Sequence, residues 1–438
     1  MEFKEKFLHH IWDQQHLIAE LNTVSGKHLK IIYQGQYNNF NGPDFKNTVL
    51  SLDGITLRGD TEIHLNTYDW YAHQHHEDIS YNSTILHVVY EHKSTSSFTI
   101  REDASPIEIL ELKNQLDADI AKLFCQYSQE PDIAKRSICD LLTINQTEQI
   151  VLLIDKYGWE RFLRKAQRFN AELSFNSFDQ LLYNGFMEAM GYEKNKFNTL
   201  AIAQHFGWDV LSEWKKNGMD STELAAIWIN YAGLWQRAEQ LLPPVSFQKL
   251  RKGFETQNFT TDKGSFSWNL FRIRPANHPV RRIVQAAVVI DSMLQKSFLT
   301  ALLDCFKEND IIKINKQNDC ILRLLNPQEV KLIPQSIGKT LSYSITGNIF
   351  LPILNLYAEK TNNTRMLERV KEILRCFPAE NCNYIINFMR DYMNPELFKV
   401  ISRKYILQQG LLQIFHKFCN YRLCEQCTQE HKHKLLTM

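Results

Sequence analysis

The residues best suited to catalysis or metal binding lie in the segment 42–65, GPDFKNTVLSLDGITLRGDTEIHL. Alternation through its second half places Asp60, Glu62 and His64 on one face and apolar residues on the other. Three titratable groups at successive same-face positions are unusual beside so regular an apolar face. The segment is therefore predicted to be a β-hairpin that carries a functional site.

The hydrophobic pattern favours one register for this hairpin. A two-residue turn would place the acids on different faces of the sheet. A three-residue loop whose last residue, Gly54, forms a left-handed G1 bulge opposes apolar to apolar residues. It also sets Asp44 across from Glu62, and Lys46 across from Asp60, with Cβ atoms about 4.5–5.5 Å apart. We therefore expect the three-residue loop, with two carboxylates close enough to share one cation.

Two carboxylates that close repel each other unless a lysine, a shared proton or a hard divalent metal neutralises them. Mg²⁺ or Mn²⁺ suits oxygen ligands and leaves water free for hydrolysis of a phosphodiester. The alternative is an exposed hairpin face on which the Asp60–Lys46 pair serves only solubility.

The segment that follows the hairpin is rich in histidine. His73, His75 and Asp78 could form a zinc site, because imidazole plus carboxylate is a normal ligand set for Zn²⁺. They lack the helical i, i+4 pair of a zinc protease motif, however. We expect these residues, with Asp60, to surround the hairpin site, and keep a zinc-dependent hydrolase as an alternative. His87, in an apolar strand, is expected to be a hydrogen-bonded core histidine.

Both helical and strand periodicity appear among the elements that must position these residues. Apolar residues at helical spacing predict a helix over 3–21, and the polar stretch 68–80 predicts a loop or short helix. Five strands are predicted, at 28–34, 45–52, 55–65, 84–91 and about 97–101. The sequence thus predicts an α/β or α+β domain over residues 1–105.

Beyond this domain the chain is predicted to be mostly helical, from 106 to 438. Long helical periodicities begin at 106–125, and strand-like alternation is scarce. The best candidates for linkers are 128–136 and 254–266, and 254–266 is the favoured place for a subdivision of the helical region.

The hairpin residues resemble a known motif. Pro43-Asp44, followed 18 residues later by Glu62-Ile63-His64, resembles the core of the PD-(D/E)XK phosphodiesterases. The resemblance implies a restriction-endonuclease-like mixed sheet and a Mg²⁺-dependent nuclease in which Asp44 and Glu62 hold the metal. The family usually has lysine where this chain has His64, so either His64 replaces it or Lys46 supplies the amine. Glu20, on the predicted first helix, is similar in position to an extra metal ligand of some members.

A longer string, GPDF…GDTEIH…DWYAHQHHED…YNSTILHVVYE, resembles an uncharacterised bacterial family, domain-of-unknown-function family 2851, over nearly the whole chain. This resemblance implies no particular activity. The leading hypothesis is a metal-dependent nuclease. The rivals are a non-catalytic nucleic-acid-binding or scaffold protein with a degenerate nuclease fold, and the zinc-dependent hydrolase.

Two basic segments are candidates for binding DNA or RNA. The charged stripe on the predicted helix 159–169 is interpreted as an ordinary solvated face. The segment 268–282 combines arginines with aromatic residues, which suits phosphate contact and base stacking. Its four candidate residues are Arg272, Arg274, Arg281 and Arg282.

Near the C-terminus, Cys419, Cys424 and Cys427 have the spacing C-x4-C-x2-C. Three thiolates need a fourth ligand to hold Zn²⁺ or a [4Fe–4S] cluster. Some PD-(D/E)XK nucleases are similar in carrying an iron–sulfur cluster on C-terminal cysteines; three free thiols are the alternative. The candidates for the fourth ligand are Cys376, Cys382, His416, His431 and His433.

The composition bounds the remaining possibilities. The chain has 438 residues, 44% of them hydrophobic, and a net charge of +1, so any nucleic acid must be met by local basic patches. No apolar run approaches the roughly 20 residues of a membrane span. An odd count of nine cysteines and the lack of an apolar leader predict a reducing compartment, the cytoplasm.

Overall fold

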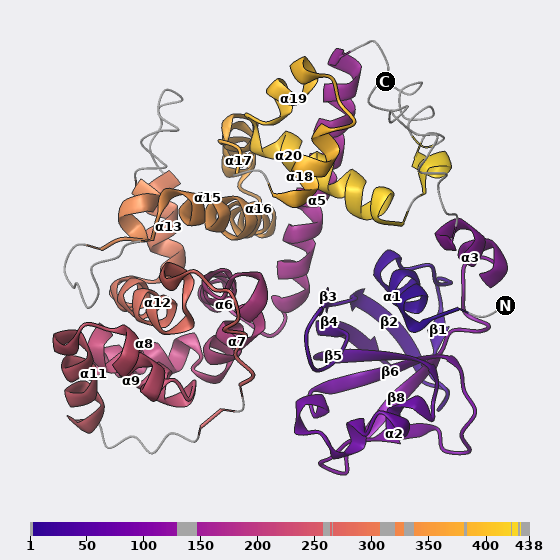
Figure 1. Cartoon of the computed structure of the whole chain (residues 1–438), viewed down its shortest axis with the longest axis horizontal. Helices are drawn as coiled ribbons and strands as arrows, with labels where there is room; N and C mark the ends of the chain where they lie inside the picture. Colours follow the sequence, from indigo (N-terminus) through magenta and orange to yellow (C-terminus); the bar gives the residue numbers. More distant parts are fainter. Residues whose placement is uncertain are drawn as a thin grey trace. The chain divides into compact units, whose positions relative to one another are not determined.

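The computed structural model describes residues 3–128, 147–256, 263–264, 266–306, 320–327, 337–380, 383–421, 423–427 and 430. The chain divides into two compact units. The first comprises residues 1–157, 385–397 and 411–438, and the second comprises 158–384 and 398–410. The predicted site residues of the hairpin all belong to the first unit, which contains a mixed β-sheet (Figure 1).

The sheet of the first unit has eight strands in the order β1-β2-β4-β5-β6-β8-β7, with β3 beside β4. β2, β4 and β5 form an antiparallel meander, whereas β6 runs parallel to β5, and β8 parallel to β6. The strands are β1 Leu21–Asn22, β2 His28–Tyr33, β3 Gln36–Tyr37, β4 Phe45–Leu52, β5 Ile55–Asn66, β6 Thr84–Glu91, β7 Phe98–Ile100 and β8 Pro106–Glu111.

Helix α1 (Glu5–Gln14) covers one face of this sheet through Phe7, Ile11 and Trp12, which share a core with Ile63. Successive strand residues face opposite sides, so Glu62 and His64 face away from that core. The short helix α2 (Asp69–Ala72) places Trp70 in a small second cluster with Tyr81 and Ile107. The candidate site thus lies on the sheet face that carries the α2 cluster.

Two element predictions need correction. The helix expected over 3–21 ends at Gln14, because Gln15 adopts a left-handed conformation (φ 57°). The helix expected over 106–125 is instead β8 followed by α3 (Ile120–Ser128), so the sheet extends past the boundary predicted at 105. All four residues 107–110 are buried, Glu108 among them, so this strand is covered on both faces and lacks the clear alternation of a half-exposed strand.

The β4–β5 hairpin also differs from its prediction. Leu52 pairs with Ile55, so a two-residue turn closes it, with positive φ at Asp53 (47°) and Gly54 (85°), as in a type I′ turn. The predicted three-residue loop is therefore wrong. A bulge between Phe45 and Thr48 then shifts the register by one residue and pairs Phe45 with Thr61.

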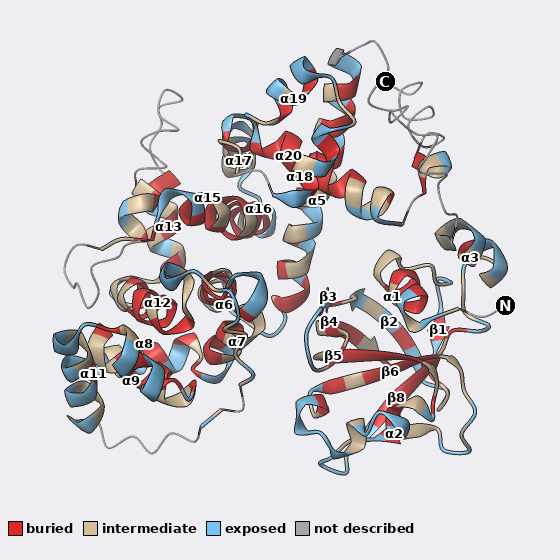
Figure 2. Ribbon diagram, viewed as in Figure 1, coloured by how far each residue is buried: buried red, intermediate tan, exposed pale blue. Residues whose placement is uncertain are grey.

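The helices of the second unit enclose a large apolar core, shown as buried segments in Figure 2. Within it, Cys305 and Cys320 form a disulfide, the one bridge among the described residues. The helices from α5 onward are α5 Thr147–Glu172, α6 Phe178–Met190, α7 Tyr192–His205, α8 Trp208–Lys216, α9 Ser221–Tyr231, α10 Trp235–Leu241, α11 Pro244–Thr256, α12 Pro279–Met293, α13 Phe298–Phe306, α15 Lys339–Ile345, the π-helical η4 Thr346–Phe350, α16 Leu351–Lys360, α17 Thr364–Cys376, α18 Tyr384–Arg390, α19 Pro395–Ile401 and α20 Tyr405–Lys417.

Across the described parts of the chain, no single helix has both the length and the apolar character of a membrane span. The bent pair α12 and α13 meets that test together, by length and composition alone.

Candidate functional site

Two hydrogen bonds across the β4–β5 hairpin hold the side chains of Glu62 and Asp44. The backbone N–H of Asp44 donates to Glu62 Oε2 (2.9 Å), and the backbone N–H of Ile63 donates to Asp44 Oδ2 (3.0 Å). The same Asp44 oxygen lies 3.2 Å from Nε2 of His9, on helix α1. The structure therefore brings the two carboxylates of the sequence motif to one place, with a histidine beside them.

The electrostatics of this pair are unusual. Burial, and then the neighbouring charge of Asp44, raise the pKa of Glu62 to about 9. Without a cation, the Glu62 carboxyl is therefore protonated at neutral pH. Burial also raises the pKa of Glu5, a further acid near Asp44 that comes from the first turn of α1.

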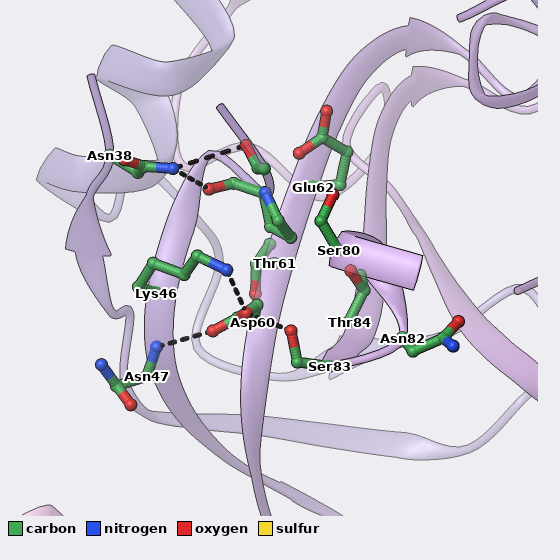
Figure 3. Close-up of polar contacts among 12 residues, drawn as sticks. Asn38, Lys46, Asn47, Asp60, Thr61, Glu62, Ser80, Asn82, Ser83 and Thr84 are labelled. Atoms are coloured by element: carbon green, nitrogen blue, oxygen red, sulfur yellow. Dashed lines mark hydrogen bonds and ion pairs between the residues drawn. The ribbon is translucent and has the colours of Figure 1, made fainter. Parts of the chain in front are cut away.

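Asp60 forms a separate polar cluster, drawn in Figure 3. Its carboxylate accepts hydrogen bonds from Lys46 Nζ (2.8 Å), from the backbone N–H of Asn47 (3.0 Å) and from the Ser83 hydroxyl. Lys46 thus faces Asp60, as predicted, and its ammonium group is bound there. Asp60 fixes the β4 bulge, at which Asn47 has a positive φ of 58°.

A group of three histidines lies next to Glu62. His64 on β5, His73 at the end of α2 and His75 in the 3-10 turn η1 (His75–Glu77) each offer one ligand atom, all within 4.8 Å of one another. His73 Nδ1 is 3.2 Å from His64 Nε2. Glu62 Oε1 is 3.4 Å from His75 Nε2 and 3.6 Å from His64 Nε2. The carboxylate pair and the imidazoles therefore meet at Glu62.

A buried chain of hydrogen bonds stands behind His64. His64 Nδ1 lies 2.9 Å from His87 Nε2, and His87 Nδ1 lies 2.8 Å from Thr99 Oγ1. Burial lowers the pKa of His64 well below its usual value, and that of His87 to about 3, so both rings are neutral. The prediction that His87 is a hydrogen-bonded core histidine is confirmed.

Asp78 does not belong to the group of possible metal ligands. It is exposed, and its side chain accepts a hydrogen bond from the backbone N–H of Ser80 (2.8 Å) at the start of the 3-10 turn η2 (Ile79–Tyr81). The third histidine of the ligand group is His64 rather than this carboxylate. Asp78 thus caps a turn.

Sequence reasoning missed Glu5 and His9. Their i, i+4 spacing places them on one side of α1, which is a signal that could have drawn attention to them. Glu20, the acid that was considered instead, is exposed and lies beyond the end of the helix.

The arginines of the segment 268–282 divide into two kinds. Arg272 and Arg274 are exposed, and the Arg272 guanidinium lies 4.9 Å from the ring centroid of Phe271, itself 71% exposed. Arg281 is half-buried. Arg282 is buried and donates hydrogen bonds to Gln285, to Tyr192 and to Asn277, so its prediction as a displayed nucleic-acid contact is wrong. It holds the loop to α12.

The interpretation of the 159–169 stripe as a solvated face is also wrong in part. Arg161 and Lys165 both donate hydrogen bonds to Gln409 Oε1, at 3.1 and 2.7 Å. Arg168 forms a two-point ion pair with Glu188. These long side chains reach across to neighbouring helices, and the pattern of charges alone does not reveal such partners.

The cysteines of the C-terminal segment keep their predicted role as a hypothesis. Cys419 and Cys424 are half-buried and Cys427 is buried. Three of the candidates for a fourth ligand, Cys382, His431 and His433, lie outside the described residues.

The fold and site define a protein with a mixed-sheet unit that carries a carboxylate and imidazole cluster, joined to a helical unit. The chain belongs to the family described as protein of unknown function DUF2851, whose model matches residues 5–383. No curated protein and no solved structure matches the chain.

Proposed function

We propose that the chain is a divalent-metal-dependent phosphodiesterase that cleaves nucleic acid, with Asp44 and Glu62 as metal ligands. The observation that carries this proposal is the pair of backbone hydrogen bonds that hold the two side chains at neighbouring positions: Glu62 Oε2 accepts from the Asp44 N–H, and Asp44 Oδ2 accepts from the N–H of Ile63, the residue after Glu62. The negative charge of Asp44 disfavours ionisation of Glu62, and a cation bound by both carboxylates would remove that repulsion. When no cation is bound, the raised pKa of Glu62 means that a proton neutralises its carboxylate instead.

The order of the elements supports the phosphodiesterase class. A helix, three antiparallel strands, a short connection and a fourth strand parallel to the third follow one another as α1, β2, β4, β5, α2 and β6. The PD-(D/E)XK enzymes resemble this arrangement, with their acidic residues at the positions that Asp44 and Glu62 occupy here. The departure from that pattern is His64, in place of the usual lysine.

The donor atoms suit a divalent ion, because carboxylate oxygens are the ligands that Mg²⁺ and Mn²⁺ prefer. Glu5, which interacts electrostatically with both Asp44 and Glu62, adds a third acid to the group. An ion held by Asp44 and Glu62 would stabilise the negative charge that develops on a phosphodiester during attack by water.

His9 is the best-placed group to take the proton of the attacking water. Its Nε2 lies 3.2 Å from Asp44 Oδ2, and its side chain is 15% exposed. His64 is less suited, because it is 1% exposed and both its nitrogens face other imidazoles. Lys46 is less suited because Asp60 holds its ammonium group.

The loop that carries Phe271, Arg272 and Arg274 supports a nucleic-acid substrate. An exposed aromatic ring beside two exposed guanidinium groups offers base stacking together with phosphate contact.

The test is cleavage of labelled single- and double-stranded DNA and RNA by the full chain, with Mg²⁺ or Mn²⁺ supplied separately. Asp44→Asn and Glu62→Gln should each abolish cleavage while leaving nucleic-acid affinity intact or raised, because each removes a metal ligand and also a charge that repels phosphate. Glu20→Gln is the matched control: it removes an exposed carboxylate of the same unit and should cleave as the wild type does.

If the wild-type chain binds nucleic acid but cleaves none with either ion, the proposed nuclease activity is contradicted. A non-catalytic nucleic-acid-binding or scaffold protein is then favoured. His9→Gln should lower the cleavage rate without weakening metal binding. Equal rates for His9→Gln and wild type would exclude His9 as the proton acceptor.

A further inference from the structure

We infer that His64, His73 and His75 form a binding site for a divalent transition-metal ion of the Zn²⁺ class. Glu62 Oε1 is the fourth ligand. The site shares Glu62 with the proposed function, but its other ligands are the three imidazoles, and it calls for a different kind of ion.

The spacing of the ligand atoms matches a small tetrahedral site. Ligand atoms about 2.0–2.1 Å from one Zn²⁺ ion at tetrahedral angles lie about 3.3–3.4 Å from one another. His73 Nδ1 is 3.2 Å from His64 Nε2, and Glu62 Oε1 is 3.6 Å from that same His64 atom. His75 Nε2 is 3.4 Å from Glu62 Oε1. These three separations are close to the tetrahedral value, and the ligand atoms of the three histidines all lie within 4.8 Å of one another.

The environment of His75 gives a second, independent reason. Its Nε2 atom is shielded from solvent and makes no hydrogen bond to any described residue, although Glu62 Oε1 lies close by. The ring itself is held in place by stacking on Tyr81, with centroids 3.9 Å apart. A buried polar atom without a hydrogen bond is costly, and a metal ion would satisfy this one.

The support behind His64 is of the kind that metal-binding histidines have. A histidine ligand is normally oriented by a hydrogen bond at its other nitrogen. His64 Nδ1 contacts His87 Nε2 at 2.9 Å, and His87 Nδ1 contacts Thr99 Oγ1 at 2.8 Å. This series of hydrogen bonds fixes the His64 ring with Nε2 directed at His73 and Glu62.

The donor set selects the ion. Three imidazole nitrogens and one carboxylate oxygen suit Zn²⁺ and related transition metals, whereas Mg²⁺ prefers oxygen ligands throughout. His73 is exposed, so an ion can enter from solvent at that side of the group.

The experiment titrates the chelator-treated full chain with Zn²⁺ against a chromophoric chelator, and with Co²⁺ by absorption. Tetrahedral Co²⁺ bound by nitrogen and oxygen gives intense visible bands without the near-ultraviolet thiolate band that the C-terminal cysteines would add. Loss of an outer-shell partner typically weakens metal binding by about 10–100-fold. We expect His73→Ala and His75→Ala each to weaken binding at the thiolate-free site by more than that. Thr99→Val should weaken it by about 10-fold.

His76→Ala is the matched control. It removes the neighbouring imidazole of the same 3-10 turn, which lies outside the ligand group. It should bind both ions as the wild type does. Because His73 is exposed, His73→Ala should keep the wild-type circular dichroism spectrum, so a loss of binding cannot be attributed to unfolding.

Wild-type affinity in both His73→Ala and His75→Ala would overturn the inference, as would the absence of a thiolate-free Co²⁺ spectrum in the wild type. These outcomes are separate from the proposed function. Mg²⁺-dependent cleavage without Zn²⁺ binding would overturn this inference alone, and Zn²⁺ binding without cleavage would overturn the proposed function alone.

Discussion

Glu62 keeps its proton at neutral pH when no cation is bound, so the ion-free protein should become less stable as the pH rises above 7. A carboxyl group whose pKa is higher in the folded chain contributes stability that is complete below its unfolded pKa. That stability is lost as the pH rises to the folded value. For Glu62 the window runs from 4.5 to about 9.

The expected magnitude follows from the same linkage. Inside the window, each pH unit removes about 1.4 kcal/mol of unfolding free energy, because the folded chain binds one more proton than the unfolded chain. Between pH 7 and 8, with a folded pKa of about 9, the loss is about 1 kcal/mol. The buried histidines His10, His64 and His87 act in the opposite sense and at lower pH. Their pKa values are lowered from 6.5, so their contribution is complete above that value and is lost on acidification.

The assay is urea denaturation of the full chain with chelator at pH 7, 7.5 and 8, with Glu62→Gln as reference. Glutamine keeps an acceptor for the Asp44 N–H but does not titrate. The difference in unfolding free energy between the two proteins should change by about 1 kcal/mol over this range. The same difference, measured in proteins that also carry Asp44→Asn, should change less, because this substitution removes the charge that helps to raise the pKa of Glu62. Parallel profiles for wild type and Glu62→Gln would refute the reasoning.

Three further predictions concern other parts of the chain. Arg272→Ala should weaken nucleic-acid binding and reduce the slope of log affinity against log salt by about 1, whereas Arg282→Ala should lower the melting temperature and leave that slope unchanged. Asp60→Asn should cost about 3 kcal/mol of unfolding free energy in denaturation, by stranding the Lys46 ammonium, without changing Zn²⁺ affinity. If the C-terminal cysteines hold a metal, Cys424→Ser should lower the zinc or iron content found by elemental analysis; equal content would leave the thiols without a metal role.

Most of the sheet could be predicted from the sequence, because its strands show alternation and are bounded by turn residues. The predicted strands at 45–52 and 84–91 coincide with β4 and β6, and that at 55–65 ends one residue short of β5. β8 could not be recognised, since burial on both faces removes the alternation that distinguishes a strand from a helix. The length of α1 was overestimated because apolar residues continue at helical spacing past Gln15, where the backbone turns left-handed.

The candidate site was predictable only in part. Glu62 and His64 share a strand, so their common face follows from the period of two. His73 and His75 approach that face through α2 and η1, and the direction in which such short turns bring a side chain is set by tertiary packing around Trp70. The sequence could therefore indicate histidine ligands, but not that His64 would join His73 and His75 in one group.

The contact between Asp44 and Glu62 depends on two features that the sequence analysis missed and that compensate for each other. A two-residue turn alone would pair β4 and β5 one residue out of the predicted register, and such a slip sends side chains to opposite faces. The bulge at Asn47 restores the register from Phe45 onward, at the cost of a left-handed non-glycine residue. Asp60 offsets that cost, because its buried carboxylate accepts the Asn47 N–H and the Lys46 ammonium. Asp60 is thus the support that holds Asp44 beside Glu62, which explains why an acid on the same strand as the candidate ligands binds a lysine instead.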